Sequence, residues 1–179
     1  MVYTPDEEET FECFVDADFC GSWDKEAAMD DPDTARSRSG HVILYAGCPI
    51  LWTSKMQSII ALSTTEAEYI ALSEAIREVI PIMELMVELH ARGVMHYCKP
   101  QVKCTVFEDN SGAIELANVP KMRPRTKHIN IRYHHFRQWV DCGKIVVQQV
   151  TTEDQAADML TKPLALHLFR RHRQRIQGW

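Results

Sequence analysis

The chain has 179 residues, of which 45% are hydrophobic and 25% charged, and its formal net charge is −5. This composition predicts one globular domain with a real core and excludes disordered and fibrous classes. No apolar run approaches the roughly 18 residues that cross a bilayer, and the amino terminus lacks a signal-peptide pattern. We therefore expect an intracellular protein without a membrane partner.

The spacing of the cysteines and the distribution of charge along the chain narrow the kinds of site that we expect. The six cysteines contain no Cys-x-x-Cys pair, which argues against a zinc site and against a disulfide framework. The first fifth of the chain is acidic, whereas no acidic residue follows Asp158 and the chain ends in FRRHRQRIQGW. That basic end suits either a solvated helix face or a contact with nucleic acid, and both interpretations stay open.

The first half of the chain predicts three strands and a long helix. Residues 10–19 alternate as a strand, 21–40 are polar and predict a loop, and 41–47 with 49–55 predict a hairpin, which gives an antiparallel meander. The long helix begins at the capping box formed by Ser63 and Glu66 and extends to Gly93. We expect a kink or break near Pro81.

The second half predicts a βαα pattern followed by a strand and further helices. The predicted elements, in chain order, are a strand over 101–109, a helix over 110–118, a helix over 125–143, a strand over 144–150, a capped helix over 151–162 and a basic helix from 163 onward. Strands and helices in this order indicate a mixed α/β domain.

Carboxylates stand in several of these elements where apolar groups are expected. Alternation places Asp16 and Asp18 on one face of the first strand and does not choose between them. In the long helix, the residues that share the face of Glu68 are mainly apolar, whereas Glu66 shares its face with Ser73 and Arg77. Glu68 is therefore the glutamate that we expect to point toward the sheet.

Further carboxylates lie near the ends of later elements. Glu108 and Asp109 end a strand that enters a helix, the usual edge for ligands in α/β sheets, and Asp158 lies in a segment of small and apolar residues. Carboxylates without histidine or cysteine ligands suit Mg²⁺ or Mn²⁺. Two such ions can hydrolyse a phosphodiester and relieve the repulsion among the carboxylates.

Five motifs follow one another along the chain: FVDADFCGSW, SRSGHVILYAGCPILWTSKMQSIIALSTTEAEYIAL, VFEDNSGAIELA, KHINIRYHHFR and TTEDQAADMLTKPL. In this order they resemble the RNase H domain of copia-type retrotransposon polyproteins, over about residues 11–164. The resemblance implies an RNase H-like α/β fold: a mixed five-stranded sheet, with three antiparallel strands and then two parallel ones, flanked by helices. We divide the chain into an acidic extension (1–10), the domain (11–164) and a basic terminal helix (165–179).

The resemblance also implies a site and an activity. The family's acidic tetrad falls on Asp16, Glu68, Asp109 and Asp158, which would hold two Mg²⁺ or Mn²⁺ ions. The implied reaction is endonucleolytic cleavage of the RNA strand of an RNA–DNA hybrid, leaving 3′-hydroxyl and 5′-phosphate ends, during retrotransposon reverse transcription. The implied partners are the hybrid and the reverse transcriptase domain of the same polyprotein, in the cytoplasm, the nucleus or a virus-like particle.

A basic run between the predicted helices of the second half is the expected nucleic-acid contact. Its residues are Lys121, Arg123, Arg125, Lys127, His128 and Arg132. Several members of the wider family carry a histidine before the last aspartate, and residues 143–158 contain none. Two alternatives remain: a catalytically weak or inactive RNase H-like module that binds nucleic acid, and another nuclease or recombinase on the same fold, against which the motifs argue.

Overall fold

The structure is a computed structural model and describes residues 3, 5, 10–26, 30–94, 102–119 and 134–179. Its centre is one five-stranded sheet in the order β3-β2-β1-β4-β5. The strands are β1 (Phe11–Asp18), β2 (Arg38–Tyr45), β3 (Cys48–Met56), β4 (Cys104–Glu108) and β5 (Ile145–Gln149). The first three strands pair antiparallel, and β4 and β5 run parallel to β1, which confirms the predicted fold class.

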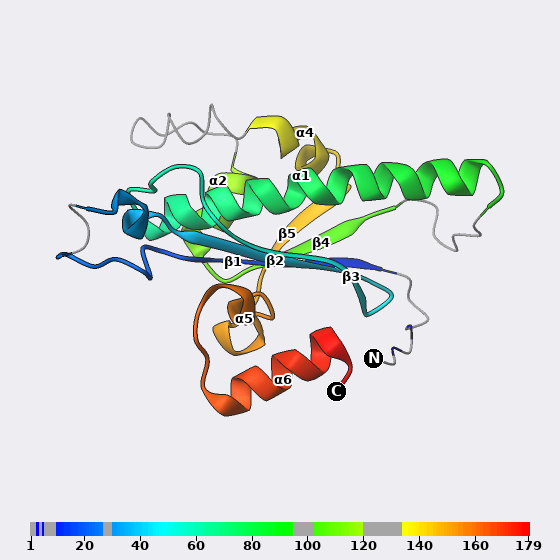
Figure 1. Cartoon of the computed structure of the whole chain (residues 1–179). Coiled ribbons are helices and arrows are strands. Elements are labelled where there is room, and N and C mark those ends of the chain that lie inside the picture. The colour runs from blue at the N-terminus through cyan, green and yellow to red at the C-terminus, as the bar shows by residue number, and fades with distance from the viewer. Residues whose placement is uncertain (1–2, 4, 6–9, 27–29, 95–101, 120–133) are drawn as a thin grey trace.

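Helices cover both faces of this sheet (Figure 1). The helices are α1 (Thr64–Ala91), α2 (Ser111–Asn118), α4 (Arg137–Asp141), α5 (Asp158–Thr161) and α6 (Leu166–Gln177). The long α1 lies on one face with α2 and α4, and α5 and α6 lie on the other. Three short 3-10 turns, Pro32–Ala35, His134–Phe136 and Thr152–Asp154, complete the described elements.

The alternation of β1 divides the core into two layers. Cys13, Val15 and Ala17 belong to the larger apolar cluster beneath α1, while Phe14 belongs to a smaller cluster that includes Ile176 of α6. A central strand buried on both faces needs this two-sided apolar pattern. Asp16 points to the same face of the sheet as Phe14, the face of the smaller cluster, so a carboxylate takes a position where an apolar core residue is expected.

The amino end of α1 forms as its capping signal predicts. The Ser63 side chain accepts a hydrogen bond from the Glu66 N–H at 3.1 Å, and the Glu66 carboxylate accepts one from the Leu62 N–H at 2.9 Å. The prediction of a break near Pro81 is wrong, because α1 continues through it to Ala91. Met83, beyond the proline, is buried in the larger cluster and holds this part of the helix to the core.

Three other element predictions need correction. Residues 21–40 include a 3-10 turn and the start of β2, which begins at Arg38. The predicted helix over 151–162 is instead a 3-10 turn and then the single turn of α5. In the described part of the predicted helix over 125–143, only a 3-10 turn and the short α4 are helical.

The division of the chain at residues 10 and 164 stays a prediction, although Ile176 of α6 packs in the same apolar cluster as Phe14.

Across the described ranges, none of the helices combines the length and apolar character that a bilayer crossing requires.

Candidate metal centre

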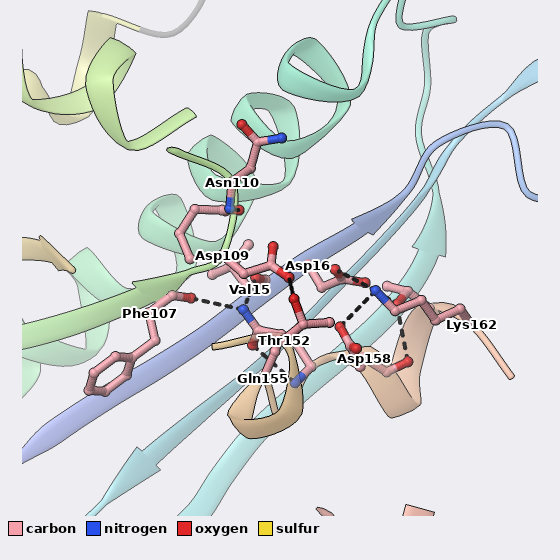
Figure 2. Close-up of polar contacts among 12 residues, drawn as sticks. Val15, Asp16, Phe107, Asp109, Asn110, Thr152, Gln155, Asp158 and Lys162 are labelled. Carbon is pink, nitrogen blue, oxygen red and sulfur yellow. Dashed lines mark hydrogen bonds and ion pairs between the residues drawn. The ribbon is translucent and has the colours of Figure 1, made fainter. Parts of the chain in front are cut away.

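The site lies where β1 and β4 part. The two strands pair from Phe11 opposite Cys104 to Phe14 opposite Phe107, and beyond that register they separate. Gln155, which is fully buried, fills the gap: its amide donates to the Val15 carbonyl at 2.8 Å and to the Phe107 carbonyl at 3.4 Å (Figure 2). One side chain therefore donates to main-chain acceptors of both strands at the point where they separate.

Asp16 lies against α5, which packs closely on the backbone of β2. It is 1% exposed, and the hydroxyl of Thr161 donates to its Oδ2. Gly40 stands opposite Asp16 in the β1–β2 ladder, and a Cβ there would lie 2.6 Å from Thr161 Cγ2 and 2.9 Å from the Cβ of Leu160. The absence of a side chain at Gly40 thus lets α5 reach Asp16.

Lys162 joins Asp16 to Asp158 (Figure 2). Its Nζ lies 2.9 Å from Asp158 Oδ1 and 3.3 Å from Asp16 Oδ1. Both carboxylates are almost completely buried, whereas the lysine side chain is 31% exposed. Charged pairs of this kind are stable only when each member keeps its partner.

Asp109 and Glu68 approach from the α1 side. Asp109 directly follows β4, and its Oδ2 accepts a hydrogen bond from the Thr152 hydroxyl at 3.0 Å. The next residue, Asn110, caps α2 through its side chain. Glu68 lies in the second turn of α1 and is 7% exposed.

Glu108, the last residue of β4, joins these two carboxylates. It is fully buried, and its Oε1 accepts the Asn110 N–H at 3.0 Å. Its Oε2 and the Oε2 of Glu68 have no hydrogen-bond partner among the described residues. Buried carboxylate oxygens without donors are costly, so each needs a proton or a cation.

The carboxylates form two sets that share Asp109. In each set, one oxygen per residue lies within 4.8 Å of the others. The paired set, named for its contact with Lys162, is Asp16, Asp109 and Asp158; the unpaired set is Glu68, Glu108 and Asp109. All four carboxylates predicted from the sequence therefore occur in these sets, and the partly exposed Asp18 does not.

The sequence placed Glu108 beside Asp109 at this strand end but outside the tetrad, and it gave no role to Lys162. Glu108 shares a strand face with the buried Cys104 and Val106, and this alternation could have indicated that its carboxylate is buried. Lys162 follows Asp158 by four residues, which on a helix brings the two side chains together. Both signals are common in sequences, and neither alone indicates a site.

Burial and mutual repulsion shift the acidity of the site. Burial raises the pKa of Glu68 to about 10, and neighbouring Glu108 and Asp16 act in the same direction. Burial also raises the pKa of Glu108 well above its ordinary value. Burial and Asp16 raise the pKa of Asp158 to about 7, although Lys162 acts in the opposite direction. These carboxylates cannot all be ionised unless further positive charge is supplied.

The donor set fits a hard divalent cation. All the candidate ligand atoms are carboxylate oxygens, and Glu68 and Glu108 each have a buried oxygen without a hydrogen-bond donor among the described residues. Mg²⁺ and Mn²⁺ prefer such oxygen ligands. The basic run predicted to contact nucleic acid, Lys121, Arg123, Arg125, Lys127, His128 and Arg132, lies outside the described residues.

The sheet order and flanking helices define an RNase H fold. LC11-RNase H1 from compost aligns with a TM-score of 0.58 at 18% identity, covering 86% of this chain and 93% of that protein. The same enzyme in complex with an RNA/DNA hybrid aligns with a TM-score of 0.54 at 15% identity, over 85% and 94%. An RNase H domain from Mycobacterium tuberculosis aligns with a TM-score of 0.54 at 11% identity, over 93% and 98%.

The homologues of this chain include retrovirus-related Pol polyproteins of plant copia-type transposons. The polyprotein of transposon TNT 1-94 from Nicotiana tabacum is 36% identical over 158 residues, which are 87% of this chain. That of transposon RE1 from Arabidopsis thaliana is 36% identical over 163 residues, or 91% of the chain. The chain spans about 10% of the length of each relative. No protein-family model matches it.

Proposed function

We propose that the chain is a metal-dependent ribonuclease H that cleaves the RNA strand of RNA–DNA hybrids. The observation that carries the proposal is the meeting of Asp16, Glu68, Asp109 and Asp158, from four separate segments, where β1 and β4 part. The RNase H fold and the retrotransposon homologues support the same activity.

We assign the four carboxylates to two Mg²⁺ or Mn²⁺ ions. Asp16 and Asp109 would anchor the ions, Glu68 would hold the ion that is nearer the RNA 2′-hydroxyl, and Asp158 would hold the ion that activates the water. Bound ions of this kind activate water and stabilise the leaving oxygen of a phosphodiester. Cleavage would leave 3′-hydroxyl and 5′-phosphate ends.

The chain's own residues keep these carboxylates in position. Thr152 donates to Asp109 and thereby fixes the orientation of the carboxylate that both sets share. Gln155 closes the gap between β1 and β4, and its Oε1 also accepts the Ala157 N–H at 3.3 Å, next to Asp158. Preorganised ligands of this kind lower the cost of reaching the transition state.

The nucleic-acid partner follows from the same proposal. One related fold, LC11-RNase H1, has been solved with an RNA/DNA hybrid, and a hybrid is the substrate that we propose for this chain. The basic run over 121–132 would contact its phosphates. The homologous polyproteins suggest that a reverse transcriptase domain of the same polyprotein is the protein partner, inside the cell.

Cleavage of an end-labelled RNA–DNA hybrid tests the proposal. In Mg²⁺ or Mn²⁺ the parent chain should cut only the RNA strand, and Asp109→Asn should lower the rate by about 100-fold or more, a typical loss for one charge-stabilising group. Asp141→Asn, at the exposed last residue of α4, is the matched control and should cleave at the parent rate. Equal cutting of a DNA duplex, or full activity in Asp109→Asn, would rule out the assignment.

The same experiment separates the alternative of a weak or inactive binding module. Lys162 favours that alternative, because its ammonium contacts the carboxylate oxygens of Asp16 and Asp158 that would otherwise bind a metal ion. Hybrid binding by the parent chain without cleavage at any concentration of Mg²⁺ or Mn²⁺ would support the module over the enzyme.

A further inference from the structure

The position of Lys162 gives the two carboxylate sets unequal compensation. Its Nζ contacts two members of the paired set, Asp158 at 2.9 Å and Asp16 at 3.3 Å. Within the described ranges, no lysine, arginine or histidine forms an ion pair with Glu68 or Glu108 of the unpaired set. The described part of the chain therefore supplies its own cation to only one of the two sets.

We propose that Lys162 is a built-in counter-cation that competes with a divalent ion for Asp16 and Asp158, so that the unpaired set binds its ion first and more tightly. This inference rests on the proposed function, since it concerns the order in which the same site takes up metal. It assigns Lys162 a regulatory role and not a catalytic one.

Electrostatics and chain geometry support competition. An ammonium group and a divalent ion that share the same two oxygens repel each other, so metal uptake by this pair requires the lysine to leave. Lys162 can leave, because its side chain is 31% exposed and carries its charge on a flexible stem of four carbons. The carboxylates themselves are fixed, Asp16 by the Thr161 hydroxyl and Asp158 by its place in α5.

The geometry of the contact makes displacement necessary. Lys162 Nζ contacts Asp158 Oδ1 at 2.9 Å and Asp16 Oδ1 at 3.3 Å, so an ion that binds these two oxygens takes the place of the ammonium. The unpaired set has no such competitor among the described residues, and its buried Oε2 atoms on Glu68 and Glu108 gain their first described partner when a cation binds.

Calorimetric titration of the whole metal-free chain with Mn²⁺ tests the inference. Lys162→Met keeps most of the length of the side chain and removes the charge, and Lys103→Met, at an exposed lysine just before β4, is the matched control. We expect two Mn²⁺ sites in the parent chain, and Lys162→Met should tighten the weaker one by roughly tenfold, equivalent to about 1.4 kcal/mol. The tighter site should change much less, and Lys103→Met should change neither.

Lys162→Met leaves Asp16 and Asp158 without their cation, so the metal-free variant should also unfold at a lower temperature than the parent. Mn²⁺ should restore its melting temperature by more than it raises that of the parent. If Lys162→Met does not fold, Lys162→Gln provides the same comparison with a polar neutral side chain.

The outcomes separate this inference from the proposed function. Unchanged or weaker Mn²⁺ binding in Lys162→Met, or equal tightening of both sites, would overturn the inference, while specific hybrid cleavage by the parent would still support the ribonuclease. If none of the variants nor the parent binds Mn²⁺, both proposals fail together.

Discussion

The two carboxylate sets share Asp109 but differ in how their charge is balanced. The paired set has a lysine 2.9 Å from one member, whereas in the unpaired set two buried glutamate oxygens have no described hydrogen-bond donor. Both sets are equally rich in carboxylates, so the number of acidic residues alone says little about the demand for metal. What decides that demand is the positive charge that the fold supplies nearby.

The sets also differ in what positions them. The unpaired set comes from α1 and the end of β4, two elements of the larger apolar layer. The paired set requires α5, a single helical turn, to lie close against β2. A change in that approach should therefore disturb the paired set and spare the unpaired one.

Gly40→Ala should produce the largest effect of this kind. The added Cβ would lie 2.6 Å from Thr161 Cγ2, so α5 must move away and take Asp158 with it. A misplacement of about 1 Å can cost roughly 100-fold in rate, and we expect a loss of hybrid cleavage of that size. Titration with Mn²⁺ should still detect the site at the unpaired set.

Gly93→Ala is the control for lost stability. Gly93 has a φ of +70°, and no described atom lies within 4 Å of the position that a Cβ would take, so alanine there brings backbone strain alone. The strain should cost about 1 kcal/mol of stability and leave cleavage unchanged. Parent-like cleavage by Gly40→Ala would show that the close approach of α5 is not needed for activity.

The pH dependence of stability should report on Asp158. Its pKa is about 7 in the folded chain, above the ordinary 3.8, so between these values the folded state binds more protons than the unfolded state. In the metal-free chain, Asp158 should therefore contribute a loss of stability as pH rises from about 4 through about 7, of roughly 2 kcal/mol, or about 4–8 °C in Tm.

Thermal melts in EDTA across this pH range measure the effect. Asp158→Asn removes one of the titrating groups and should make this part of the profile less steep, while Glu68 and Glu108, whose pKa values burial also raises, keep a slope of the same sign. Saturating Mg²⁺ should reduce the slope further, because metal binds deprotonated carboxylates. A parent profile that rises with pH, or one that Asp158→Asn leaves unchanged, would contradict the role of Asp158.

Local sequence patterns predicted the elements better than they predicted the site. Alternation located β1, and Ser63 correctly marked the start of α1, because both signals act over a few residues. Alternation could not separate Asp16 from Asp18, since the burial of Asp16 depends on Thr161, which lies 145 residues later in the chain.

The same limit explains the missed residues. The segment 151–162 has the pattern of one capped helix, but Gln155 leaves helical geometry to reach the carbonyls of Val15 and Phe107. The ion pairs of Lys162 depend on that path. Motif resemblance compensated for this limit by pointing to the four carboxylates together, although their roles stay a prediction.

Thr152→Val should have the smallest effect, and it tests the residue shared by both sets. The Thr152 hydroxyl donates to Asp109 Oδ2 at 3.0 Å, and valine keeps the branched shape without the donor. An exposed hydrogen bond to a charged group contributes on the order of 1 kcal/mol, so cleavage should fall by about fivefold. Because Asp109 belongs to both sets, both Mn²⁺ affinities should weaken together, unlike the one-sided change expected for Lys162→Met. Thr152→Ser restores the hydroxyl and should recover the parent values, whereas a loss confined to one Mn²⁺ site would show that Asp109 serves only one set.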